Sequence, residues 1–133
     1  MIDVEVFGAG RAPHGPSPLE VQRLCALTAA RMGVEDAHAA VEFVDAARIA
    51  QLNGEYRGKP VATDVLSFPI DGIEPLDGGV SRELGDVVIC PEHTADLREA
   101  IVHGMLHLLG MDHETDAGEM LALQRELLTG AQG

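Results

Sequence analysis

Aromatic residues and cysteines are both scarce in this sequence of 133 residues. It contains no tryptophan, one tyrosine and three phenylalanines, although 46% of its residues are hydrophobic. A hydrophobic core must therefore be built from aliphatic side chains and methionine. The two cysteines, Cys25 and Cys90, lie far apart and form no C-x-x-C motif, which argues against a disulfide framework. We expect both to be small, buried, apolar residues.

Basic residues are few as well. Nine Lys and Arg residues stand against 22 Asp and Glu residues, which gives a formal net charge of −13. A charge of this sign opposes the approach of the whole molecule to nucleic acid. Residues 46–63 are an exception, because three basic residues and one acidic residue sum to +2 there and leave −15 for the rest of the chain.

The sequence also has no long apolar run. No stretch approaches the roughly 20 residues that a membrane span requires. The N-terminal residues lack the basic and apolar regions of a signal peptide. We therefore expect a cytoplasmic protein without a membrane partner.

Hydrophobic periodicity predicts one α+β domain over residues 1–133. Strands are expected over residues 2–7, 39–45, 62–69 and 84–91, and helices over 18–33, 46–57, 94–109 and 119–128. This order indicates a mixed sheet of about four strands packed with helices. We expect Asp86, within the fourth strand, to be a partnered structural carboxylate, and Asp116 with Glu119 to form a capping box before the last helix.

Three of the six histidines lie within residues 103–113, HGMLHLLGMDH. His103 and His107 are four residues apart, so on a helix they lie one turn apart on the same face. Gly110 is placed where a helix needs a left-handed residue to end, and the chain can then return to present His113. Three imidazoles with one coordination position left for water are typical of a catalytic zinc. We therefore predict one zinc ion per chain, on the helix and the turn after it.

The spacing matches the metalloprotease motif H-E-x-x-H-x-x-G-x-x-H except at position 104. Gly104 replaces the glutamate that acts as general base in the proteases. A peptidase would lose the group that accepts the proton from the attacking water. A phosphodiesterase suffers less from this loss, because zinc can itself lower the pKa of water and the main task is to offset phosphate charge.

The sequence closely resembles the YbeY family of bacterial endoribonucleases in three segments. These are QLNGEYRGKPVATDVLSFP, LGDVVI and HGMLHLLGMDH. The family motif H-G-x-L-H-L-x-G-x-D-H is matched at all of its fixed positions, and so are L-N-x-x-Y-R and T-D-V-L-S-F-P. The resemblance implies a zinc-dependent endoribonuclease that cleaves single-stranded RNA in the cytoplasm. It further implies a role in maturation of small-subunit ribosomal RNA and in ribosome quality control, with the small ribosomal subunit and its assembly factors as partners.

The resemblance assigns His103, His107 and His113 as zinc ligands, and Arg57 as the catalytic basic residue that faces the RNA phosphates. Lys59 is a second candidate for substrate binding, although a solvated loop residue explains it equally well. Asp112 either hydrogen bonds a ligand imidazole from outside the metal or caps the end of the helix.

Two further functions stay open at the level of sequence. One is a metallopeptidase-like hydrolase that uses another carboxylate as its base. The other is a ribosome-assembly factor without catalytic activity, in which the zinc is structural.

Overall fold

The computed structural model describes residues 1–74, 76, 78 and 81–132. Within these residues, four strands form one sheet in the order β1-β2-β4-β3. Their bounds are Ile2–Phe7 (β1), Ala37–Phe43 (β2), Val65–Pro69 (β3) and Glu83–Ile89 (β4). The pairs β1–β2 and β2–β4 are parallel, whereas β3–β4 is antiparallel. The predicted mixed sheet and α+β class are thus confirmed.

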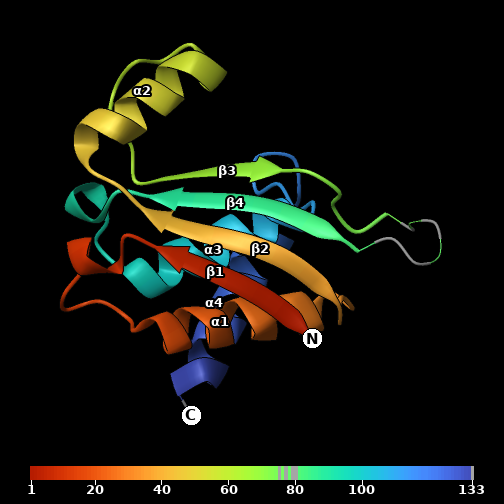
Figure 1. Cartoon of the computed structure of the whole chain (residues 1–133). Helices are drawn as coiled ribbons and strands as arrows, with labels where there is room; N and C mark the ends of the chain where they lie inside the picture. The colour runs from red at the N-terminus through yellow and green to blue at the C-terminus, as the bar shows by residue number, and fades with distance from the viewer. Residues whose placement is uncertain (75, 77, 79–80, 133) are drawn as a thin grey trace.

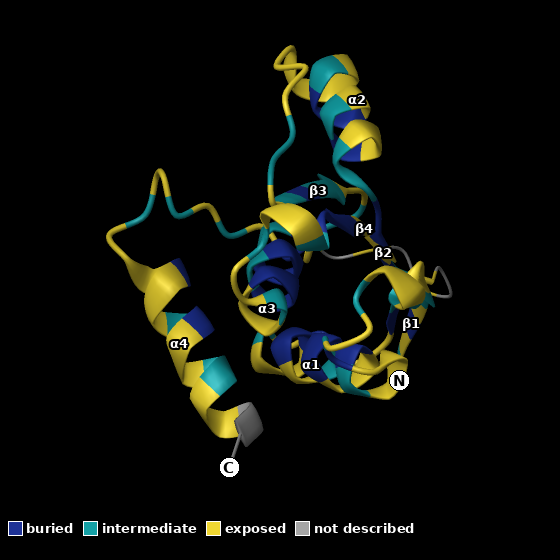
Figure 2. Ribbon diagram, turned by 90° about the vertical axis from the view of Figure 1, so that its left-hand side faces the viewer, coloured by how far each residue is buried: buried dark blue, intermediate teal, exposed yellow. Residues whose placement is uncertain are grey.

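Four α-helices of the described residues pack on or beside this sheet and leave part of one face open (Figure 1). They are α1 (Pro18–Arg31), α2 (Ala46–Arg57), α3 (Leu97–Leu108) and α4 (Glu119–Gln132), and short 3₁₀ turns span Ala9–Arg11 and Pro91–His93. Helices α1 and α3 cover one face of the sheet, and α4 lies outside α3 (Figure 2). Helix α2 projects beyond the β3 end of the sheet in both views.

Two hydrophobic clusters hold these layers together. The larger one joins α1, α3 and α4 to the covered face of the sheet and includes Val41, Ile101 and Met120, all fully buried. The smaller one joins α2 to β3 and β4 through Ile49, Leu66 and Val88, among others. Aliphatic residues dominate both clusters, as the scarcity of aromatic residues requires.

Both cysteines lie free and buried within these clusters. Burial raises the pKa of the Cys25 thiol to about 12, so this group stays protonated and unreactive near neutral pH. The expectation of small, buried, apolar cysteines is confirmed.

Side-chain caps explain where the predicted elements begin. Ser17 and Glu20 form a reciprocal capping box before α1. Asp45 ends the second strand early because its carboxylate accepts a hydrogen bond from the Arg48 amide, 2.8 Å away, and so caps α2. Asp96 caps α3, which therefore begins at Leu97 rather than at the predicted residue 94.

Two predictions of local structure were wrong. Asp86 is exposed, because its side chain points away from the face of β4 on which Val87 and Ile89 enter the larger cluster. Asp116 precedes α4, but its carboxylate binds the amides of Gly118 and Met120, while Glu119 accepts from the Ala117 amide. The reciprocal contact of a capping box is therefore missing there.

No helix among the described residues is long and apolar enough to cross a membrane.

Candidate metal centre and its cleft

The end of α3 brings the three histidines of residues 103–113 together. Gly110 takes the left-handed conformation (φ 96°) just after the helix. Its amide donates to the His107 carbonyl and the Met111 amide donates to the Leu106 carbonyl, each at 3.0 Å. This pair of hydrogen bonds is a Schellman motif, which reverses the chain and returns His113 toward the helix.

The three imidazole rings form a compact cluster. Ring centroids lie 4.7 Å apart for His103 and His107, 5.1 Å for His103 and His113, and 5.5 Å for His107 and His113. The Nε2 atoms of His103 and His107 are 3.2 Å apart. Two nitrogens bound to one tetrahedral zinc are separated by about 3.3 Å, so this pair already has the spacing of two ligands.

The environment of His103 fixes its hydrogen-bonding state. Its Nδ1 atom lies 2.9 Å from the side-chain oxygen of Gln124, which is 5% exposed on α4. Because that oxygen can only accept, Nδ1 is the donor of this hydrogen bond, and Nε2 is the nitrogen that faces the other rings and is available to a metal. The sequence reasoning missed Gln124. Its only signal is a polar residue on the apolar face of a helix, four residues after the buried Met120.

The surroundings of His107 favour its neutral form, and those of His113 leave one ring nitrogen without a hydrogen-bond partner. Burial lowers the pKa of His107, electrostatic interaction with the nearby His103 lowers it further, and a backbone hydrogen bond to Met111 offsets part of this effect. His113 has a buried Nδ1 atom with no hydrogen-bond partner. A buried polar atom without a partner indicates an interaction that the protein atoms alone do not supply.

Within the part of the chain described, no three His, Cys, Asp or Glu side chains form a ready-made metal site. In the histidine cluster, only the His103 and His107 nitrogens are in mutual contact. The donor chemistry and the unpartnered Nδ1 of His113 nevertheless fit a zinc ion.

The packing of α3 against the sheet explains the glycine at position 104. A Cβ atom placed there would lie 2.4 Å from Cγ1 of Val87 and 3.3 Å from Oγ of Ser67. The Ser67 hydroxyl also donates to the Gly104 carbonyl at 3.0 Å. Position 104 therefore faces the sheet, and a glutamate cannot occupy it without displacing the Val87 side chain of β4.

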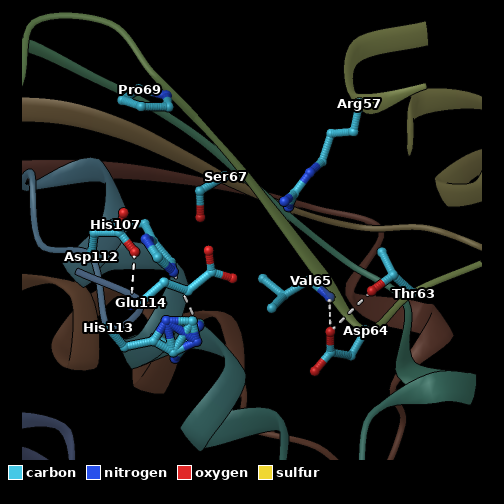
Figure 3. Close-up of a pocket in the computed structure, with 11 residues that line it drawn as sticks. Arg57, Thr63, Asp64, Val65, Ser67, Pro69, His107, Asp112, His113 and Glu114 are labelled. Atoms are coloured by element: carbon cyan, nitrogen blue, oxygen red, sulfur yellow. Dashed lines mark hydrogen bonds between the residues drawn. The ribbon is translucent and has the colours of Figure 1, made fainter. Parts of the chain in front are cut away.

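A cleft of about 550 Å³ opens over the histidine cluster. Figure 3 shows its side chains, with Arg57 pointing into it from the end of α2 and Glu114 projecting into the same space. The lining residues are Arg57, Thr63, Asp64, Val65, Ser67, Pro69, His103, His107, Asp112, His113 and Glu114. A second cavity of about 380 Å³ shares His103, His113 and Asp64 and extends toward α4, where Gln124 lines it.

The structure thus places Arg57 in the histidine cleft but leaves the other basic candidate outside. Gly58 ends α2 in the left-handed conformation (φ 71°), directly after Arg57. Lys59 is exposed and is not among the described residues that line the cleft. The buried Asn53 holds the following loop, because its side-chain amide donates to the Val61 carbonyl at 3.0 Å.

The carboxylates of the cleft mostly bind nearby backbone. Asp112 accepts a hydrogen bond from the Glu114 amide at 3.0 Å, and the described contacts include none from it to an imidazole. Asp64 accepts from the Val65 amide at 2.8 Å and so begins β3. Among the described contacts, the Glu114 carboxylate accepts no hydrogen bond from the backbone. Sequence reasoning did not select this residue, although it lines the cleft.

Comparison with known proteins assigns the chain to a family. The family described as Endoribonuclease YbeY matches residues 19–132. A protein named Endoribonuclease YbeY from Chromobacterium violaceum is 41% identical, over 77% of this chain and 66% of its own length. One from Kineococcus radiotolerans is 35% identical, over 98% of this chain and 84% of its own length.

A solved structure supports the same fold. The solution structure of a protein from Thermotoga maritima superposes with a TM-score of 0.55 at 22% identity, over 96% of this chain and 88% of the other. This likeness concerns the fold alone, whereas the family match over residues 19–132 and the two relatives show that the chain belongs to the YbeY endoribonuclease family.

Proposed function

We propose that this protein is a zinc-dependent endoribonuclease that hydrolyses single-stranded RNA. The observation that carries the proposal is the meeting of three imidazoles and one arginine in a single cleft. His103, His107 and His113 would hold one zinc ion, and Arg57 would bind the phosphate. A zinc ion held in this way supplies a Lewis acid that activates water for hydrolysis near neutral pH.

Arg57 supplies what the histidines lack. Phosphodiester hydrolysis adds negative charge to a group that is already anionic, and this molecule carries a net charge of −13. A planar guanidinium can grip two phosphate oxygens at once, whereas an ammonium group acts as a point charge. Arg57 is the only Arg or Lys among the described residues of the cleft, so it is the group that can hold and neutralise the phosphate.

Several polar groups remain available for proton transfer. Glu114 is exposed at the mouth of the cleft, and its carboxylate faces the space above the histidine rings (Figure 3). A carboxylate in this position can accept a proton from an attacking water. We propose Glu114 as the first candidate for that role, which Gly104 leaves unfilled.

The biological role that we propose follows from the family. The relatives are named as endoribonucleases, and we propose that this chain acts in the cytoplasm on small-subunit ribosomal RNA during maturation and ribosome quality control. The small ribosomal subunit and its assembly factors would be its partners. The packing at Gly104 disfavours the metallopeptidase alternative, since the glutamate of those enzymes has no room there.

A direct assay separates the three functions. Purified protein is incubated with single-stranded RNA, with the same RNA as a duplex, and with casein, each with and without a chelator. We expect cleavage of the single strand alone, and its loss with the chelator. Cleavage of casein would support the peptidase, and intact RNA in every condition would support an assembly factor without catalytic activity.

A further inference from the structure

Tyr56 is an exposed aromatic residue in a protein that has few. It is the only tyrosine of the chain, and 67% of it is exposed near the end of α2. Its ring packs against Phe68 of β3, with centroids 5.1 Å apart and an angle of 67° between the planes. This edge contact orients the tyrosine ring and leaves most of it open to solvent.

Tyr56 and the histidine cleft lie on opposite sides of one strand. Strand β3 is an edge strand. Val65, Ser67 and Pro69 line the cleft, whereas Phe68, between them, packs with Tyr56 and the α2 cluster. Alternate side chains of a strand point to opposite faces, so Tyr56 lies just across the free edge of β3 from the cleft.

Arg57 connects the two sides. It follows Tyr56 directly, and its side chain lines the histidine cleft. Together the two residues reach around the edge of β3, one with a cation and one with an aromatic ring. The segment that contains them, residues 46–63, has a charge of +2 in a chain that is otherwise strongly acidic.

The chemistry of this surface fits one class of ligand. Proteins that bind single-stranded nucleic acid combine basic groups along the backbone with aromatic rings on which unpaired bases stack. Bases of a duplex are already stacked on each other and cannot use such a ring. An RNA strand whose phosphate lies at Arg57 would pass over the free edge of β3 and bring a neighbouring base to Tyr56.

We propose that Tyr56, supported by Phe68, is a stacking site for a base adjacent to the scissile phosphate of single-stranded RNA. This inference rests on the proposed endoribonuclease function and deepens it. Arg57 binds the phosphate whether the strand is paired or not. Tyr56 accepts only an unpaired base, so it contributes the preference for single strands.

The composition of the protein provides a direct measurement. Because the chain has no tryptophan and one tyrosine, its intrinsic emission comes from Tyr56 alone. A 2′-O-methyl oligonucleotide, which cannot be cleaved, should quench this emission when single-stranded. An abasic oligomer of equal length and the annealed duplex should not. Absence of quenching, or equal quenching by the abasic oligomer, would overturn the inference.

Variant kinetics supply the second measurement. Tyr56→Leu keeps an apolar contact with Phe68 but loses the ring face. We expect its KM for single-stranded RNA to rise on the order of tenfold, with kcat and zinc content within about twofold of wild type. Tyr56→Phe should behave like wild type. The matched control is Leu19→Ala, an exposed apolar residue on α1 (65% exposed).

The outcomes separate this inference from the proposed function. Wild type that cleaves RNA while Tyr56→Leu keeps the wild-type KM would overturn the stacking site and leave the endoribonuclease standing. It would then assign this surface to a protein partner or to no ligand. Wild type that neither binds nor cleaves RNA would overturn the function and the stacking site together.

Discussion

At the scale of single residues, Arg57 concentrates the positive charge that the cleft needs. Its neighbours along the cleft include three carboxylates, Asp64, Asp112 and Glu114, so a phosphate could not approach without a counter-charge. Arg57 is the last residue of α2, directly before Gly58, and from this position its guanidinium points into the cleft. We therefore propose Arg57 as the residue that offsets transition-state charge in this site.

Arg57→Ala should reduce RNA cleavage by a factor on the order of 10² or more, as for the removal of other groups that stabilise transition-state charge. Arg57→Lys should recover part of the activity, because the charge returns without the planar fork. Zinc content and thermal stability should match wild type in both variants. The control is Arg48→Ala, which removes an exposed arginine of the same helix. Wild-type cleavage by Arg57→Ala would refute the assignment.

Substitutions at Gln124 test the metal centre through the contact that this residue makes with Nδ1 of His103. We expect Gln124→Leu to lower the affinity for zinc by about 10- to 100-fold, because His103 loses the acceptor that fixes its proton on Nδ1. Gln124→Glu should retain zinc, since a carboxylate accepts the same hydrogen bond. Competition with a coloured chelator measures both. Leu127→Ala, a partly buried residue of the same helix, controls for looser packing of α4, and an equal loss of affinity in that variant would contradict the specific role.

The residues of the site were predictable from sequence to different degrees. The three histidines follow a local pattern, because a helix and the turn after it set their spacing within eleven residues. Gln124 was not predictable, since its contact with His103 depends on how α4 packs against α3. Lys59 matched the charge pattern as well as Arg57 did. The two differ in position, because Arg57 lines the cleft and Lys59, in the loop after α2, does not. Its role in substrate binding stays a prediction.

At the scale of elements, the close approach of α3 to β4 determines what position 104 can hold. Gly104→Ala should lower the free energy of unfolding by roughly 1–3 kcal/mol, because the new methyl group overlaps Val87. Urea denaturation measures this change. The second substitution Val87→Ala should cost less in the Gly104→Ala background than in wild type, because it makes room for the methyl group. If the two losses of unfolding free energy were strictly additive, the methyl group at position 104 would not clash with Val87.

The element boundaries show where periodicity stops being informative. The order of helices and strands followed from alternation and from apolar spacing, and α2 and β1 have the predicted bounds. The first residues of α3 and β3 differ from the predicted ones. Asp96 and Asp64 accept hydrogen bonds from backbone amides at these positions, and hydrophobic periodicity carries no information about such bonds. The placement of β4 between β2 and β3 depends on non-local pairing, which no local pattern encodes.

At the scale of the whole molecule, charge is distributed unequally over the surface. The segment with the local positive balance ends at the cleft, and acidic side chains dominate elsewhere. On the uncovered face of the sheet, His38 lies between two of them. Its Nε2 is 2.7 Å from Glu5 of β1, and its Nδ1 is 2.7 Å from Glu83 of β4. Protonated His38 thus ties β2 to both of its neighbours.

This arrangement predicts a pH dependence of stability. Hydrogen bonds to Glu5 and to Glu83 raise the pKa of His38 above its ordinary value, although burial opposes them. The stabilisation is complete below the unfolded pKa of about 6.5 and is lost as pH rises through the higher folded pKa. The difference in unfolding free energy between wild type and His38→Gln should therefore shrink from pH 6 toward pH 9. A difference that is constant or grows over this range would contradict the bridge.

We propose that three histidines of one cleft hold a single zinc ion on which RNA cleavage depends. The most direct test strips the protein with a chelator and measures the rate of single-stranded RNA cleavage while zinc is returned in steps. We expect no cleavage at the start, a linear rise in rate up to one zinc per chain and a plateau after it, with His113→Ala inactive throughout. Full activity of the stripped protein, or a rise that continues well past one equivalent, would contradict it.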